Sequence, residues 1–211
     1  MIIVKIMHTV GTKIGEKYME RNSPNSQGYK LESQIREAYG RVTYTQTCHD
    51  KFINRVVGLN NTIKTWQIIL SAITTSGFVV AIFSDDNVAS ILGALFSLVL
   101  LILNTYTKNF NLIESAQEHK SASDLLWKIR EEYVSLLTDF EMLGADEIMK
   151  KRDELQERTS NVYSNSPRTD AKSYAAAQKA LKTEEEQTFS EEEIDNMLPN
   201  SIRRCNRTMQ T

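Results

Sequence analysis

Two long apolar stretches interrupt an otherwise polar chain. The first covers residues 65–84 and the second covers residues 87–107, and neither contains Lys, Arg, Asp, Glu, His or Pro. Each is close to the ~20 residues that an α-helix needs to cross the hydrocarbon core of a bilayer. The alternative is a pair of helices buried in a soluble core, but the rest of the chain has too little apolar sequence to surround them. We therefore predict two transmembrane helices.

The link between the two stretches is very short, and it contains Asp85 and Asp86. So short a connection forces the two helices to lie antiparallel, as a hairpin. Basic residues flank the outer ends of the hairpin but are absent from the link, which by the positive-inside rule predicts that both termini are cytoplasmic. These flanking residues are Lys51, Arg55 and Lys64 before the first helix, and Lys108 and Lys120 after the second.

The predicted hairpin carries a set of small and polar residues. If the chain turns about Asp85 and Asp86, residues whose numbers sum to 171 lie at the same level along the hairpin. We call this relation the depth rule. One interpretation is close packing with interhelical hydrogen bonds, worth ~0.6 kcal/mol each; the other is the lining of a pore, which needs a homo-oligomer because two helices cannot enclose a water path. The residues concerned are Gln67 (level with Asn104), Thr74 (level with Ser97), and the four on one face of the second helix, Ser90, Gly93, Ser97 and Asn104.

Heptad-like spacing on both sides of the hairpin predicts a seam between two long cytoplasmic helices. Apolar positions at spacings of 4 and 3 require a partner helix, and the simplest partners are the two segments themselves. Before the hairpin the seam positions are Leu31, Ile35, Ala38, Val42, Thr45, His49, Phe52, Val56 and Leu59; after it they are Ala116, His119, Ala122, Leu126, Ile129, Tyr133, Leu136 and Phe140.

Two histidines fall on this predicted seam. The depth rule places Phe52 level with His119, and it places His49 about one turn away, ~4.5 Å along the axis. Such a pair is compatible with a metal site, with a pH sensor, or with a hydrogen-bonded polar layer in the core. We therefore single out His49, Phe52, His119, Leu126 and Tyr133 as the seam residues of interest.

The remaining sequence predicts a small C-terminal extension on an all-α protein. After Gly144 we expect a charged helix over 146–160, a turn at 165–167, an alanine-rich helix over 170–182, and a short helix that opens with a capping box at Ser190 and Glu193. Residues 22–28 are expected to be a flexible linker, with Met19 as an alternative start. The predicted regions are thus a flexible or mis-called N-terminus (1–29), the helical hairpin (30–143) and the extension (144–211).

Composition adds few candidate functions. The net charge of −2 offers no basic stripe for nucleic acid. The sequence contains no phosphate-binding loop, nucleophile elbow or metal-binding motif, so we expect neither an enzyme nor a cofactor. Its two cysteines, Cys48 and Cys205, match no metal-ligand spacing, and the predicted topology places both on the reducing side, where a disulfide is disfavoured.

Several motifs resemble the SLATT family, two-transmembrane effector domains associated with nucleotide-sensing bacterial conflict systems. In the hairpin they are NNTIKTWQIILSAITTSGF (60–78) and LILNTYTKNFNLIESAQEHKSASDLLWKIREEYVSLLTDF (101–140). In the extension they are KRDEL (151–155), SPRTDAKSYAAAQKALK (166–182) and TFSEEEIDNMLP (188–199). The extension is similar to one subfamily in particular, often found beside reverse-transcriptase genes.

The resemblance implies a function that the residue pattern alone does not. It implies a bacterial inner-membrane, multi-pass effector of anti-phage defence, which oligomerises and forms a pore or disrupts the membrane when a partner activates it. The result would be growth arrest or cell death. The implied partners are the lipid bilayer, further copies of the chain, and a sensor or reverse transcriptase encoded nearby. The alternative is a passive two-transmembrane anchor or scaffold for a soluble enzyme.

Overall fold

The protein is an elongated all-α structure, which confirms the predicted fold class. The computed structural model describes residues 24–83 and 87–204, with side chains for all of these except 24–26, 78–87 and 89. No strand occurs among the described residues. The helices are α2 (Pro24–Phe83), α3 (Asn87–Asn109), α4 (Leu112–Thr138), α5 (Ala145–Asn165), α6 (Ala171–Lys182) and α7 (Glu191–Met197), followed by the 3₁₀ turn η1 (Asn200–Ile202).

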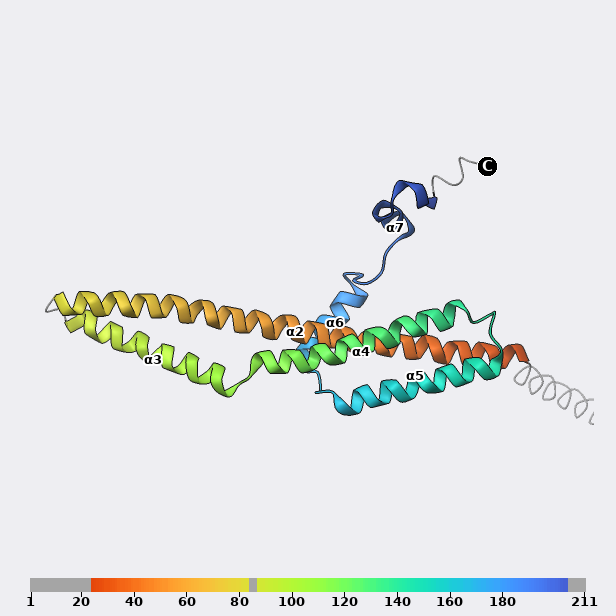
Figure 1. Ribbon diagram of the computed structural model, residues 1–211, viewed down its shortest axis with the longest axis horizontal. Helices are drawn as coiled ribbons and strands as arrows, with labels where there is room; N and C mark the ends of the chain where they lie inside the picture. Colours follow the sequence, from red (N-terminus) through yellow and green to blue (C-terminus); the bar gives the residue numbers. More distant parts are fainter. Residues whose placement is uncertain (1–23, 84–86, 205–211) are drawn as a thin grey trace, which may run out of the picture.

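A single helix, α2, extends along most of the molecule. It has 60 residues without interruption, and α3 and α4 run back along its two halves (Figure 1). The predicted linker over 22–28 is wrong for the described part of that range, because α2 begins at Pro24. Proline is well tolerated in the first turn of a helix, where its missing N–H would have no intrahelical partner. Residues 1–23, with the proposed alternative start, lie outside the described part.

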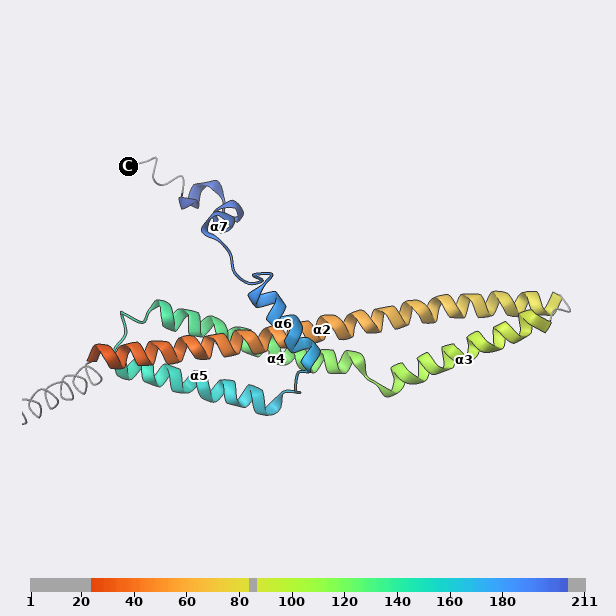
Figure 2. The same ribbon diagram turned by 180° about the vertical axis from the view of Figure 1, so that it is seen from behind.

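The predicted hairpin is present as two antiparallel helices, α2 and α3, which lie side by side in both views (Figures 1 and 2). The predicted turn at Asp85 and Asp86 lies outside the described residues. On the return path the helix breaks once, at Phe110 and Asn111, where the amide of Leu112 donates to the carbonyl of Phe110 at 2.8 Å. No glycine or proline marks this break, and sequence reasoning did not predict it.

The seam lies between α2 and α4 and forms the core of the half of the molecule that lies away from the hairpin. Most predicted seam positions are buried, including Ile35 and Leu126, each at 0 % exposure. The prediction that Leu59 is buried in the seam is wrong: Leu59 is 44 % exposed, and Asn60 and Ile63 are buried in its place. After Val56 the buried stripe therefore advances by four residues instead of three. A straight α-helix has 3.6 residues per turn, so a strict heptad drifts and needs such an extra step to stay facing its partner.

The extension packs back onto the seam. Helix α5 covers α4 and contributes Ile148, Leu155 and Val162 to the hydrophobic core that contains Tyr133. Helix α6 lies across α2 and buries only small side chains, Ser173, Ala177 and Ala180. Helix α7 stands away from the other helices in both views (Figures 1 and 2). It opens with the predicted capping box, in which Ser190 and Glu193 each bond the other's backbone N–H.

Candidate functional site: a polar layer in the seam and a polar face on the hairpin

Two histidines from different helices meet inside the seam. His49 on α2 and His119 on α4 are 3 % and 1 % exposed, and their Nδ1 atoms lie 2.9 Å apart. In a neutral pair one Nδ1 carries a hydrogen and donates it while the other accepts, so the two rings adopt different tautomers. The depth rule placed these residues one turn apart, and the structure brings them into direct hydrogen-bond contact.

A chain of ring and charge contacts continues from this pair to the surface. The ring of Phe52 stacks on His119, with centroids 3.7 Å apart and planes tilted by 13°. The guanidinium of Arg55 lies 5.3 Å from the centroid of the Phe52 ring, within the range of a cation–π contact. Arg55 also forms a two-pronged ion pair with Asp170, in which Nη1 donates to Oδ1 at 3.1 Å. These residues, His49, Phe52, Arg55, His119 and Asp170, form what we call the polar layer, which links α2, α4 and the start of α6.

Burial sets the charge state of the histidine pair. Burial, with a smaller contribution from the neighbouring His119, lowers the pKa of His49 to about 4. Burial also lowers the pKa of His119, although Glu118 and Asp170 oppose this shift. Both rings are therefore neutral at pH 7. Among the described residues no group of three or more His, Cys, Asp or Glu is placed to hold a metal ion. The geometry found is that of a hydrogen-bonded polar layer.

Asp170 has two roles at the start of α6. It is the N-cap residue, and its Oδ1 accepts the backbone N–H of Ser173 at 2.8 Å. Its ion pair with Arg55 and these hydrogen bonds hold the pKa of the Asp170 carboxyl far below its usual range. A capping carboxylate that also pairs with a cation ties the helix start to its neighbour. This contact therefore attaches α6 to α2.

The link after α6 is tied to the seam by further polar contacts. The ammonium group of Lys51 donates to both carboxylate oxygens of Glu186, at 2.7 and 2.9 Å. The amide of Gln187 donates to Thr47 Oγ1 at 3.1 Å and accepts from Arg130 of α4. The segment after α6 therefore contacts both helices of the seam. It does so through side-chain hydrogen bonds for which solvent can compete.

Helix α6 covers a face of α2 that contains a buried thiol. Tyr44 and Arg55 contact α6 through Tyr174 and Asp170, and Cys48 lies on the same face of α2, one turn after Tyr44. Cys48 is a free thiol at 3 % exposure, and burial raises its pKa to about 11. At neutral pH this thiol is protonated and unreactive. Its accessibility therefore reports whether α6 stays docked.

The hairpin presents apolar side chains to the outside. Within the described residues, one helical stretch in Ser90–Thr138 is long and apolar enough to cross a membrane, and none of its most apolar window is buried inside the protein. In water an exposed surface of this kind would be unfavourable, whereas in a bilayer it faces lipid. The exposed apolar side chains of α3 are Val88, Ile91, Leu92, Leu95, Leu98, Val99, Leu101 and Ile102.

The polar residues of the hairpin are only partly paired as the depth rule suggests. Gln67 Nε2 donates to Asn104 Oδ1 at 2.9 Å, as expected for residues at one level. Thr74 instead donates to the carbonyl of Leu70 in its own helix, at 2.8 Å. On α3, Ser90 and Ser97 are exposed and Gly93 is half-buried. These residues therefore stay on the surface of a single copy, and a role in lining a pore stays a prediction.

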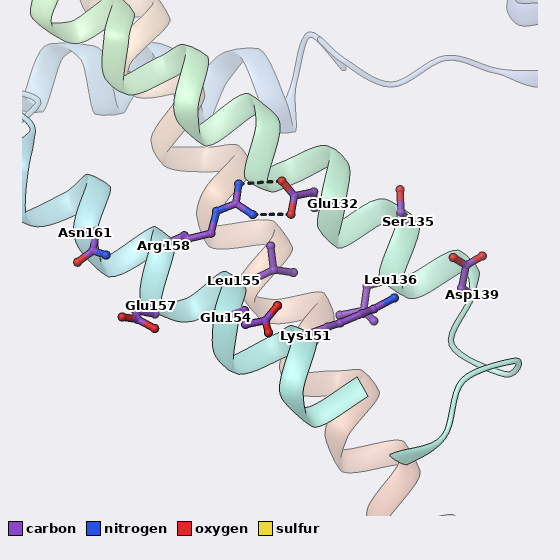
Figure 3. A pocket seen from close by; sticks show the side chains of 10 residues that line it. All are labelled: Glu132, Ser135, Leu136, Asp139, Lys151, Glu154, Leu155, Glu157, Arg158 and Asn161. Atoms are coloured by element: carbon purple, nitrogen blue, oxygen red, sulfur yellow. Dashed lines mark hydrogen bonds and ion pairs between the residues drawn. The ribbon is translucent and has the colours of Figure 1, made fainter. Parts of the chain in front are cut away.

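The half of the molecule that contains the seam also has a surface groove of about 610 Å³ between α4 and α5 (Figure 3). Arg158 and Glu132 bridge it with a two-pronged ion pair at 2.5 and 2.7 Å, which lowers the pKa of Glu132. Neither histidine nor cysteine lines the groove. The lining residues are Glu132, Ser135, Leu136, Asp139, Lys151, Glu154, Leu155, Glu157, Arg158 and Asn161.

Sequence reasoning missed the contact between α6 and the seam. Arg55 was recognised only as a basic residue near the membrane, and Asp170 only as the start of an alanine-rich helix. One signal was available, because Asp170 precedes the helix in the position of an N-cap residue. Its second partner, 115 positions away in the chain, cannot be found from local pattern.

Comparison with known proteins gives one family. A family model described as "SMODS and SLOG-associating 2TM effector domain family 4" matches residues 31–193. No curated protein and no solved structure matches the chain. The matched range contains the hairpin, the seam and most of the extension. The polar layer and the polar face of the hairpin therefore both lie inside the matched range.

Proposed function

Because this chain belongs to the SMODS and SLOG-associating 2TM effector domain family 4, we propose that it is a gated membrane effector of a bacterial conflict system. In the resting state the hairpin lies in the inner membrane with both termini in the cytoplasm. On activation, several copies assemble and open a pore or disrupt the bilayer. Loss of the membrane barrier then stops growth of the infected cell.

One observation carries this proposal: α2 continues unbroken from the seam into the hairpin. A helix is stiff along its axis, so a displacement of its cytoplasmic half also moves its membrane half. The return path, in contrast, breaks at Phe110 and Asn111, which lets α3 and α4 move separately. The continuous helix α2, beside the interrupted return path of α3 and α4, suits a transition between two packing arrangements. Gating requires two such alternative arrangements.

The polar layer is where we place the control of this transition. Its members come from α2, α4 and α6, and a partner that displaces α6 would remove Asp170 from Arg55. The buried interface of α6 consists of small side chains, so its docking depends largely on polar contacts. An interface of this composition separates at lower cost than an apolar one.

The membrane step is assigned to the polar face of the hairpin. Ser90, Gly93, Ser97 and Asn104 lie on one face of α3, with Gln67 and Thr74 on α2, and they would line the lumen in an oligomer. The partners of the proposal are the bilayer, further copies of this chain, and a sensor or reverse transcriptase encoded nearby.

Leakage from dye-loaded vesicles tests the proposal. Full-length protein is reconstituted with the products of neighbouring genes, and dye release is recorded for the native chain and for two variants. Ser97→Leu fills the proposed lumen and is expected to abolish release. Val99→Leu changes a lipid-facing side chain of the same helix and should leave release intact. Absence of release with every partner present would refute the effector mechanism.

A passive anchor is the second candidate, favoured by the surface of α7. Phe189, which precedes α7, and Met197, the last residue of α7, are 62 % and 64 % exposed, and the helix stands away from the seam (Figure 1). Such a segment would suit capture of a soluble partner at the membrane. This function predicts that an unrelated hairpin of equal length replaces residues 65–107 without loss of activity, whereas the effector function predicts complete loss.

A further inference from the structure

A groove of about 820 Å³ lies between α2 and α3, at the end of the hairpin nearer the seam. Given the proposed topology, this end faces the cytoplasmic leaflet of the membrane. Lys64 and Gln67 lie at its mouth, and its deeper lining combines apolar side chains with the hydroxyl groups of Thr75 and Ser76. Its lining residues are Lys64, Gln67, Ile68, Ser71, Ala72, Thr75, Ser76, Leu100 and Asn104.

The mouth of the groove offers a positive charge and an amide donor. Lys64 is exposed, and no ion pair of the described residues includes it. Asn104 uses its carbonyl oxygen to accept from Gln67 at 2.9 Å, which leaves its NH₂ group as a donor. No acidic residue lines the groove. An ammonium group beside an amide N–H is a suitable pair of donors for a phosphate diester.

Apolar side chains lie along the groove, beside hydroxyl groups that are hydrogen-bonded within α2. Ile68, Ala72 and Leu100 are apolar, and the hydroxyl of Thr75 donates to the Ser71 carbonyl at 2.8 Å. Ser76 likewise donates to the carbonyl of Ala72, at 2.9 Å. These hydroxyl groups are satisfied within α2 and need no partner in the groove.

The length of the groove matches one leaflet. Twelve residue steps separate Lys64 from Ser76, which at 1.5 Å per residue is ~18 Å along the helix axis. Half of a ~30 Å hydrocarbon core is ~15 Å. One acyl chain that starts at the headgroup level therefore runs the length of the groove and ends near the bilayer midplane.

We propose that this groove binds one anionic phospholipid of the cytoplasmic leaflet. Lys64 and the amide of Asn104 hold the phosphate, and one acyl chain lies along Ile68, Ala72 and Leu100. Basic pockets between transmembrane helices on the cytoplasmic side are known receptors for anionic headgroups. The inference rests on the membrane location and orientation given under the proposed function. The competing occupant is a helix from a second copy, which small residues such as Ser71 and Ala72 would let approach closely.

The test uses full-length protein in vesicles of equimolar phosphatidylglycerol and phosphatidylcholine. Flotation scores membrane association, and the lipid that co-purifies in mild detergent is then quantified. With the native chain, the ratio of phosphatidylglycerol to phosphatidylcholine in the bound lipid is expected to be several-fold above the 1:1 ratio of the vesicles. Lys64→Gln should remove this enrichment, and Ala72→Phe, which fills the groove, should reduce all bound lipid. Lys108→Gln, a lysine of α3 outside the groove lining, should behave like the native chain.

Four results would overturn the inference, and they differ in what else they affect. Floating protein without enrichment, or with equal losses for the Lys64 and Lys108 variants, rejects the lipid site alone. An Ala72→Phe variant that loses its oligomer on size exclusion but keeps its lipid assigns the groove to a second copy. Protein that stays in the soluble fraction rejects the lipid site together with the proposed membrane location.

Discussion

Acidification should destabilise the seam through the buried histidine pair. His49 is neutral in the folded protein, and its pKa falls from the ordinary 6.5 to about 4. Below pH 6.5 the unfolded chain therefore binds a proton that the folded chain does not, so the free energy of unfolding decreases as the pH falls. The loss spans the window from about pH 6.5 to about pH 4. His119 is shifted in the same direction and adds to the effect.

The magnitude follows from these pKa values. At pH 5 the unfolded state gains about 2 kcal/mol relative to the folded state from His49 alone, since one pKa unit corresponds to ~1.4 kcal/mol. In a protein of this size ~2 kcal/mol corresponds to a decrease in Tm of about 4 to 8 °C. Asp50 acts in the opposite direction, because burial raises the pKa of its carboxyl group. A variant that removes only the histidine therefore isolates its share.

Thermal unfolding in detergent, followed by circular dichroism at 222 nm, measures this effect. The native chain and His49→Gln are each melted at pH 7.5 and at pH 5. The native chain should lose several more degrees of Tm on acidification than the variant. An equal decrease in the two proteins would refute the assignment of a buried, neutral His49. A larger decrease in the variant would mean that the ring is protonated in the folded state.

Two further substitutions test the core and the docking of α6. Leu126→Ala should lower the free energy of unfolding by about 2–5 kcal/mol, because the Leu126 side chain is fully buried. Leu125 is 45 % exposed on the same helix, so Leu125→Ala should change this free energy by less than ~0.5 kcal/mol. Chemical denaturation measures both variants, and similar values would contradict the burial of Leu126 in the seam. Arg55→Ala should release the start of α6 and speed labelling of Cys48 by a thiol reagent several-fold, measured in a Cys205→Ser background. Unchanged labelling would show that α6 stays docked without this ion pair.

The hairpin and the seam were predictable because each follows from a repeated pattern. The length of an uninterrupted apolar run predicts a membrane helix, and heptad spacing predicts which helix faces meet. The depth rule extended this to individual contacts, such as the hydrogen bond of Gln67 to Asn104 and the stacking of Phe52 on His119. It worked there because two antiparallel helices joined by a short turn have only one register.

The remaining features depend on contacts that no local period encodes. Helix α6 buries alanine and serine side chains, which have little amphipathic signal, and it is attached by the ion pair of Asp170 with Arg55. The break at Phe110 and Asn111 contains neither glycine nor proline, although Asn111, the N-cap residue of α4, is of a type favoured at that position. Leu59 was misassigned because a strict heptad was continued past the point where the helix needs an extra residue.

The most direct test of the effector function is membrane potential in a bacterial host. The chain is expressed under controlled induction, with and without the products of neighbouring genes, and a potential-sensitive dye reports depolarisation together with viability. We expect depolarisation that requires both an activating partner and an intact hairpin, and that Ser97→Leu abolishes. A membrane-located protein that leaves the potential unchanged, with every neighbouring product present and phage added, would contradict a pore-forming or membrane-disrupting role and favour the anchor.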